Sequence, residues 1–183
     1  MLLEISFIQK FILYLTNPAY STSIVIFSFL FFSGLGSFYS KKIERNYIGS
    51  LKTIILSLCA ILLSYQIVLP YVFSVTLKYS LLFRILITLI IISPLGFLMG
   101  MPFPLGIRLV NSTEQGKGLI PWLWATNSFC SIIASVSAVI IALFFGFKVV
   151  AILAALIYLF GFLSINYREQ DGSLGNREPS CSL

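Results

Sequence analysis

The chain has 183 residues, of which 58% are hydrophobic and 10% are charged, and its mean hydropathy is +1.00. This composition excludes an ordinary water-soluble domain, because it leaves too little polar surface to cover an apolar core. The net charge of +6 does not indicate a nucleic-acid-binding protein, because the basic residues are spread along the chain at the ends of hydrophobic runs.

Five long runs contain no Asp, Glu, Lys or Arg: 11–40, 53–77, 85–107, 118–147 and 149–167. Each approaches or exceeds the roughly 20 apolar residues that a helix needs to cross about 30 Å of hydrocarbon. We therefore predict an all-α fold, a polytopic transmembrane bundle of about six helices. This bundle occupies residues 1–165, and residues 166–183 form a polar cytoplasmic tail that we expect to be disordered.

The first segment, residues 1–16, contains polar groups in a sequence otherwise rich in Leu, Ile and Phe: Glu4, Gln9 and Lys10. Glu4 and Gln9 lie roughly 140° apart around a helix, so they cannot share one narrow face. Ionisable groups inside a membrane usually face the bundle interior and mark function, and Glu4 is a candidate for protonation or for pairing with Lys10 or Arg108. The alternative is that this segment lies near the interface, where its polar groups reach water.

Prolines and small residues divide the next part of the chain. Asn17-Pro18 separates the first segment from a second helix, about 18–40, because proline is favoured in the first turn of a helix. Ser33, Gly34, Gly36 and Ser37 near its end form a candidate site of close helix packing. A third helix, about 47–69, is expected to end or kink at Pro70.

A fourth helix, about 80–100, leads into a proline- and glycine-rich segment that ends at Arg108. We predict a helix break around 100–106, at Gly100, Pro102, Pro104 and Gly106. One hypothesis makes this break a broken helix or re-entrant turn that forms a binding element, with Arg108 holding an anionic group. The other, which we favour, makes it a helix end at the cytoplasmic interface with Arg108 facing lipid phosphates.

A fifth helix, about 119–145, carries a stripe of small residues at spacings of three and four, namely Ser128, Ser131, Ser135, Ala138 and Ala142. Such a stripe predicts close helix packing and not a catalytic serine, since the chain has no histidine to activate one. Trp122 and Trp124 at its start are expected to anchor at the headgroup level.

Asn127 lies one to two turns into the fifth helix, which is otherwise apolar. Its amide must find a partner, because an unpaired polar group in an apolar environment is costly. We expect an interhelical hydrogen bond, and the alternative is that Asn127 lines a cavity as a ligand-binding group. A sixth helix, about 148–165, completes the bundle.

The basic residues follow the expected alternation of the helices across a membrane. Eight of them (41, 42, 45, 52, 108, 117, 168, 177) fall on one side and three (78, 84, 148) on the other. The positive-inside rule therefore predicts that both termini face the cytoplasm, which places the chain in a bacterial cytoplasmic (inner) membrane if its source is bacterial.

Five stretches of sequence resemble the membrane region of large bacterial spermidine-synthase-like proteins: LLEISFIQK (2–10), NPAY (17–20), FFSGLGS (31–37), GFLMGMPFPLGIR (96–108) and IPWLWATNS (120–128). In that family, multi-pass helices flank or follow a soluble domain similar to polyamine aminopropyltransferases. The resemblance spans roughly residues 2–165 and covers only the C-terminal membrane part. It implies a longer first helix, so we expect the chain to be a fragment, a split gene product or a shortened reading frame.

The chain lacks the Gly-rich turn and acidic residues that the aminopropyltransferase-like domain would bring, so we expect no enzymatic activity of its own. We also expect no cofactor, no metal site and no nucleic-acid partner. Our main hypothesis is a non-catalytic membrane module that anchors or partners such a domain, with the loops 41–46 and 107–118 as contact surface. The alternative is a bundle that transports or binds a polyamine or a lipid through Glu4, Gln9, Arg108 and Asn127. Such a bundle would be expected to form a homo-oligomer through the stripe on the fifth helix.

Overall fold

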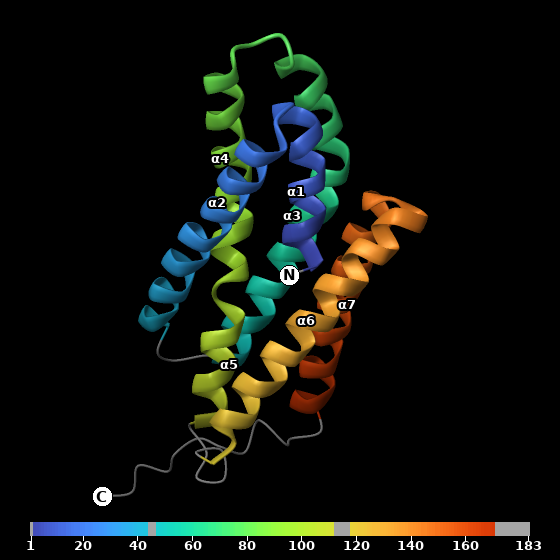
Figure 1. Cartoon of the computed structure of the whole chain (residues 1–183). Coiled ribbons are helices and arrows are strands. Elements are labelled where there is room, and N and C mark those ends of the chain that lie inside the picture. The colour runs from blue at the N-terminus through green and yellow to red at the C-terminus, as the bar shows by residue number, and fades with distance from the viewer. Residues whose placement is uncertain (1, 44–46, 112–117, 171–183) are drawn as a thin grey trace, which may run out of the picture.

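The computed structural model describes residues 2–43, 47–111 and 118–170, and these ranges contain helices but no strand (Figure 1). The α-helices are α1 (Leu2–Leu15), α2 (Pro18–Tyr39), α3 (Tyr47–Thr76), α4 (Leu81–Met99), α5 (Pro102–Asn111), α6 (Ile120–Phe145) and α7 (Phe147–Gln170). A short 3-10 turn, Ser40–Lys42, follows α2. Because α4 and α5 are two parts of one span, the described part of the bundle has six helical segments, as the sequence predicts.

Within the described ranges, five helical spans are long and apolar enough to cross a membrane. They are Pro18–Lys42, Tyr47–Thr76, Leu81–Asn111, Ile120–Phe145 and Lys148–Tyr167. The described helix of α1 has 14 residues, about 21 Å at 1.5 Å per residue, which is shorter than the roughly 30 Å of a hydrocarbon core. Figure 1 shows that α1 begins midway along the bundle and runs to the end at which α3 and α4 are joined.

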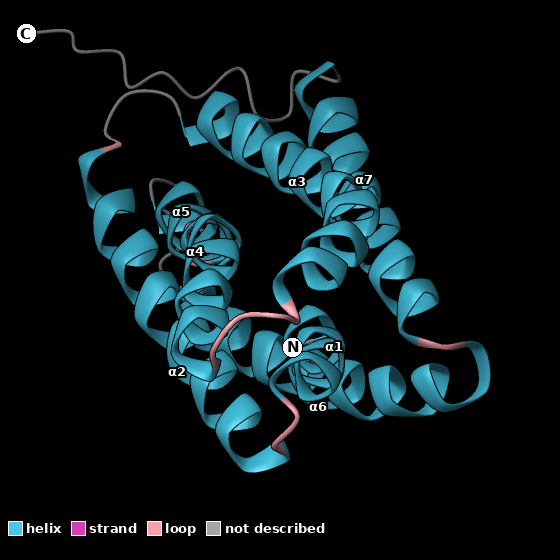
Figure 2. Ribbon diagram, turned by 90° about the horizontal axis from the view of Figure 1, so that it is seen from above, coloured by secondary structure: helices cyan, strands magenta, loops and turns pink. Residues whose placement is uncertain are grey.

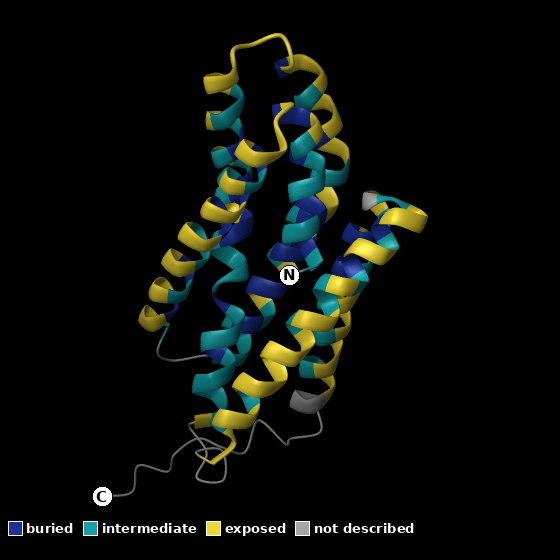
Figure 3. Ribbon diagram, in the orientation of Figure 1, coloured by how far each residue is buried: buried dark blue, intermediate teal, exposed yellow. Residues whose placement is uncertain are grey.

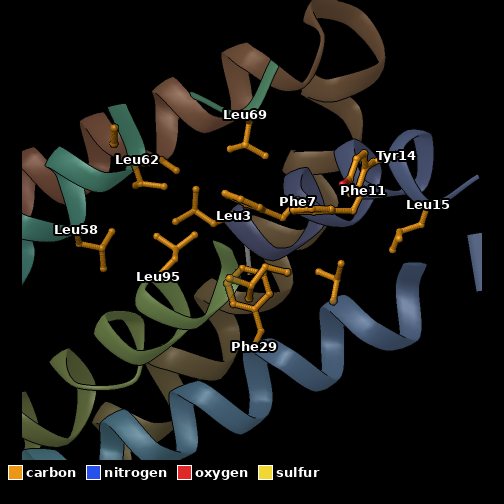
Figure 4. Close-up of a cluster of buried hydrophobic side chains, with 14 residues drawn as sticks. Leu3, Phe7, Phe11, Tyr14, Leu15, Phe29, Leu58, Leu62, Leu69 and Leu95 are labelled. Carbon is orange, nitrogen blue, oxygen red and sulfur yellow. The ribbon is translucent and has the colours of Figure 1, made fainter. Parts of the chain in front are cut away.

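The short helix α1 lies at the centre of the bundle, where α2, α4, α6 and α7 all contact it (Figure 2). Its aromatic residues account for this position, because Phe7, Phe11 and Tyr14 are almost completely buried. Phe7 packs edge-on against Phe29 of α2, and Tyr14 stacks on Phe73 of α3 at 4.3 Å between ring centroids. The main hydrophobic cluster therefore forms around α1 (Figure 4).

The outer faces of the long helices are apolar and exposed (Figure 3). On α6, for example, Leu143 and Phe144 are 79% and 80% exposed. A chain that turns such side chains outward along whole helices needs lipid, and not water, as its surrounding solvent.

The backbones of α2 and α4 approach each other most closely at two glycines. A Cβ atom on Gly36 would lie 2.0 Å from the carbonyl oxygen of Phe97, and one on Gly100 would lie 2.0 Å from that of Ser33. No side chain fits at either point, so the two glycines permit the crossing of α2 and α4. Gly34 faces open space instead, because a Cβ atom added there would have no neighbouring atom within 4 Å.

The break in the fourth span is narrower than the predicted 100–106, because it is confined to Gly100 and Met101. Pro102 and Pro104 lie in the first turn of α5, where a missing N–H group removes no intrahelical hydrogen bond. Gly106 is helical. The segment continues in the direction of α4 and does not re-enter the bundle, so it is a helix break and not a re-entrant turn (Figure 1).

Two other prolines, Pro70 and Pro94, lie inside continuous helices. Helix α3 passes through Pro70 and continues to Thr76, seven residues beyond the predicted end at 69. Pro94 lies inside α4, where it leaves the carbonyl of Ile90 without its usual N–H donor. The Ser93 hydroxyl donates a hydrogen bond to that carbonyl at 3.0 Å, so the freed group is satisfied.

The last helix is longer than predicted, since α7 extends to Gln170 and not to about 165. The polar tail expected at 166–183 thus begins with helical residues. The rest of it, 171–183, lies outside the described residues, as do Met1, 44–46 and 112–117.

Candidate functional site

One of the polar groups predicted in the first segment, Lys10, meets a partner from α3. The Lys10 ammonium group donates a hydrogen bond to the side-chain oxygen of Gln66 at 3.0 Å. Lys148, at the start of α7, is close enough for its charge to repel that of Lys10. Gln9 is half-buried, and no hydrogen bond joins its side chain to the described part of the chain. Lys10 and Gln66 therefore form one polar contact between α1 and α3.

A second polar group ties the end of α1 to the joint between α3 and α4. The hydroxyl groups of Tyr14 and Thr76 are 2.7 Å apart and share a hydrogen bond. Arg84 donates to the carbonyl oxygen of Tyr14 at 3.3 Å and also to those of Leu77 and Tyr79. Because guanidinium groups commonly satisfy the free carbonyls at helix ends, we interpret this group as structural.

A cavity of about 320 Å³ lies below the start of α1, between the end of α4 and the helices α6 and α7. Most of its wall is apolar, and the residues that line it are Leu2, Leu3, Met99, Asn127, Cys130, Ser131, Ala134, Ala154, Ile157 and Tyr158. The position of the cavity follows from the short length of α1, which fills the centre of the bundle only from its midpoint to one end (Figure 1).

Three polar side chains that line this cavity have no hydrogen-bond partner among the described residues. The side chains of Asn127, Ser131 and Tyr158 form no hydrogen bond with any residue that the structure describes. By contrast, the serines one turn away on either side of Ser131 are satisfied within α6: Ser128 donates to Trp124 and Ser135 to Ser131, each through the carbonyl oxygen and each at 2.9 Å. The cavity thus holds hydrogen-bonding capacity that the protein itself does not use.

Glu4 lies near this cavity but lines a different one. It borders a space of about 280 Å³ between α1 and α2, together with aliphatic side chains and Phe29. Its carboxyl group is near enough to Tyr158 to act electrostatically on the Tyr158 hydroxyl. Glu4 therefore contributes charge to the surroundings of the cavity without being part of its wall.

Arg108 binds elsewhere, at the end of α2. Its guanidinium group donates a hydrogen bond to the carbonyl oxygen of Ser40 at 3.1 Å, which ties α5 to the 3-10 turn after α2. The four residues predicted as one intramembrane site are therefore not brought together. Asn127 lines the cavity, Glu4 lies beside it, Arg108 stabilises a helix end, and Gln9 forms no hydrogen bond with the described residues.

The small-residue stripe of α6 divides between two surroundings. Ala138 and Ala142 are buried in a cluster with Val150, which includes Leu2 and Ile5 of α1. Ser131 faces the cavity, Ser128 is exposed, and Ser135 is half-buried. Two of the five residues of the stripe, Ala138 and Ala142, are thus buried within this chain.

Sequence reasoning missed Tyr158 and Gln66. A tyrosine or a glutamine in an apolar run does not by itself distinguish a cavity wall or an intramembrane partner from an interfacial position. Both cysteines with described surroundings, Cys59 and Cys130, are free thiols. Among the residues that the structure describes, no group of three or more Cys, Asp or Glu side chains is arranged to hold a metal ion.

These features define a class: the protein is a polytopic α-helical membrane protein whose core is organised by a short central helix. Comparison of the chain with protein-family models, with curated proteins and with solved structures finds no match. The assignment to this class accordingly rests on the apolar spans and on how the helices pack.

Proposed function

We propose that the chain is the non-catalytic membrane module of a spermidine-synthase-like protein, which anchors or partners a cytoplasmic aminopropyltransferase-like domain. The resemblance of residues 2–10, 17–20, 31–37, 96–108 and 120–128 to the membrane region of that family motivates the proposal. The protein would lie in a bacterial inner membrane with both termini in the cytoplasm.

The observation that carries the proposal is the concentration of basic side chains at one end of the bundle. Lys41 and Lys42 lie in the 3-10 turn after α2, Lys52 lies in the second turn of α3, and Arg108 lies in the last turn of α5. The loops 41–46 and 107–118 also contain one acidic residue each, Glu44 and Glu114, which lie outside the described residues. A basic surface of this kind suits the cytoplasmic side and an acidic partner surface.

Part of the proposed contact surface is described and part is not. Of the loop 41–46, residues 44–46 lie outside the described residues, and of the loop 107–118, so do residues 112–117. Lys41 and Lys42 stack over the rings of Phe38 and Tyr39, at 5.2 and 5.4 Å from the ring centroids, so these two ammonium groups are held at the end of α2.

Purification of the tagged chain from its native membranes in a mild detergent tests the proposal. We expect a soluble aminopropyltransferase-like protein, identified by mass spectrometry, to co-purify at low salt. Lys41→Gln/Lys42→Gln should weaken this association, whereas Lys78→Gln at the opposite end should leave it unchanged. The proposal fails if no aminopropyltransferase-like partner is recovered from the native source.

A further inference from the structure

The cavity between α1, α4, α6 and α7 gathers three polar side chains that have no partner among the described residues: Asn127 is exposed, and Ser131 and Tyr158 are half-buried. Asn127 and Ser131 project from α6 and Tyr158 from α7, and aliphatic side chains of all four helices complete the wall. A polar group without a partner in an apolar environment carries a substantial free-energy cost. Something other than the protein must therefore supply the missing hydrogen bonds.

The size and lining of the cavity indicate the kind of molecule that fits. A volume of about 320 Å³ lies at the lower end of the range for small-molecule sites, about 300–1,000 Å³. Leu3, Met99 and Ile157 offer a surface for an alkyl chain. Water alone would satisfy the polar side chains but not the apolar wall, so an amphipathic molecule suits the cavity better than water does.

The charged residues in and near the cavity indicate which head group an amphipathic ligand would carry. No Lys or Arg side chain lines the cavity, so an anionic head group would have no counter-charge there. The carboxyl group of Glu4 does not line the cavity, but it is near enough to act electrostatically on Tyr158, which does. An alkylammonium group has three N–H donors and no acceptor. The side-chain oxygens of Asn127, Ser131 and Tyr158 provide three acceptors.

We infer that this cavity binds a small amphipathic primary amine. Its ammonium group donates to Asn127, Ser131 and Tyr158, and its alkyl chain lies along Leu3, Met99 and the other aliphatic side chains. The inference does not depend on the proposed partner domain, because it rests on the lining of the cavity and on the nearby carboxyl group of Glu4. An amine-binding cavity would remain if no aminopropyltransferase-like partner existed. Equally, the chain could anchor such a partner if the cavity bound no amine.

Equilibrium binding of tritiated n-hexylamine to the protein in lipid nanodiscs tests the inference, with empty nanodiscs subtracted to remove partitioning into lipid. We expect saturable binding with one site per chain. Unlabelled n-hexylamine should compete fully, n-hexanol weakly because it lacks the charge, and hexanoate not at all. Absence of saturable binding, or equal competition by hexanoate, would overturn the inference.

Matched variants locate the site. Asn127→Leu and Tyr158→Phe each remove one acceptor for a charged donor, so each should weaken binding about tenfold. Ser131→Ala should weaken it in the same direction. Two control substitutions on the same helices, Ser128→Ala and Tyr167→Phe, lie away from the cavity and should leave the affinity unchanged.

A further variant tests the cavity by volume and not by hydrogen bonding. Ala134→Leu places extra methyl groups in the cavity and should abolish binding. Each variant is compared with the native chain by gel filtration and circular dichroism, so that loss of folding is recognised. If folded Asn127→Leu, Tyr158→Phe and Ala134→Leu all bind n-hexylamine with native affinity, the cavity is not the site and the inference is refuted.

Discussion

Replacing Gly36 by alanine is expected to push α2 and α4 apart. The new Cβ atom would lie 2.0 Å from the carbonyl oxygen of Phe97, whereas an ordinary contact requires at least 3.4 Å. The obstacle is a backbone atom, which cannot rotate away as the end of a long side chain can. The helices must therefore move by about 1.4 Å along this line, or bend to the same effect.

The magnitude follows from the packing that such a movement loses. A radial gap of about 0.5–1 Å forfeits a quarter to a half of the dispersion energy of each atom pair. Overpacking of a well-packed interface typically costs about 1–3 kcal/mol, and we expect Gly36→Ala to lie in that range. Gly100→Ala should behave alike, because its backbone φ of −74° suits any residue and its clash with Ser33 is purely steric.

The control is Gly34→Ala, two residues away in the same helix. A Cβ atom on Gly34 would enter open space, so alanine there should be neutral or should stabilise α2 by up to about 1 kcal/mol through helix propensity. Both substitutions in α2 share this propensity gain, so the difference between Gly34→Ala and Gly36→Ala isolates the steric effect.

Titration with SDS in mixed micelles, followed by tryptophan fluorescence, measures these differences. Gly36→Ala should unfold at a clearly lower SDS fraction than Gly34→Ala. The double variant Gly36→Ala/Gly100→Ala should lose less than the sum of the single variants, since one separation of the helices relieves both clashes. Equal unfolding midpoints for Gly34→Ala and Gly36→Ala would refute the reasoning.

Two further predictions test the packing and the depth of the helices. Tyr65 donates a hydrogen bond to the carbonyl oxygen of Ile91 at 2.6 Å, so Tyr65→Phe should lower stability in the same SDS assay by about 0.6–1.7 kcal/mol. The control is Tyr71→Phe on the same helix, which should have no effect because the Tyr71 side chain is 72% exposed. Equal effects of the two substitutions would contradict a stabilising role for the Tyr65 hydrogen bond. Trp122 and Trp124 lie in the first turns of α6 and are both exposed. Lipids brominated close to the headgroup should therefore quench their fluorescence more strongly than lipids brominated near the chain ends. The opposite order would show that the start of α6 does not lie at the headgroup level.

Much of the fold can be predicted because the charges of the chain mark the helix ends. A long apolar run without Asp, Glu, Lys or Arg is expected to cross or enter lipid. There a helix forms because it pairs the backbone N–H and C=O groups of the segment with one another. The break after α1 is equally predictable, since Asn17-Pro18 combines a capping residue with a proline. The Asn17 side chain does accept a hydrogen bond from the N–H group of Ala19 at 3.0 Å, and Pro18 opens α2.

The partners of particular residues cannot be predicted, because they depend on which helices become neighbours. Gly34 and Gly36 are indistinguishable in sequence, yet Gly36 meets α4 and Gly34 faces outward. Prolines terminate these helices less often than the sequence suggests: Pro70 and Pro94 lie inside continuous helices, and the Ser93 hydroxyl satisfies the carbonyl that Pro94 leaves free.

The candidate site illustrates the same limit. The sequence identifies Asn127 as a polar group that needs a partner, and the structure gives it a cavity. The other members of that cavity come from helices far apart in the chain. Tyr158 joins it from α7, and Leu3 lies there because α1 begins at the middle of the bundle. Only the packing of the central helix reveals that these side chains share one space.

The central claim is that lipid surrounds the long helices of this protein, and alkaline carbonate extraction of membranes tests it most directly. Washing at strongly alkaline pH strips proteins that are held by surface charge alone. We predict that the full chain stays in the membrane pellet and enters the supernatant only when detergent is added. Release into the carbonate supernatant without detergent would contradict the account.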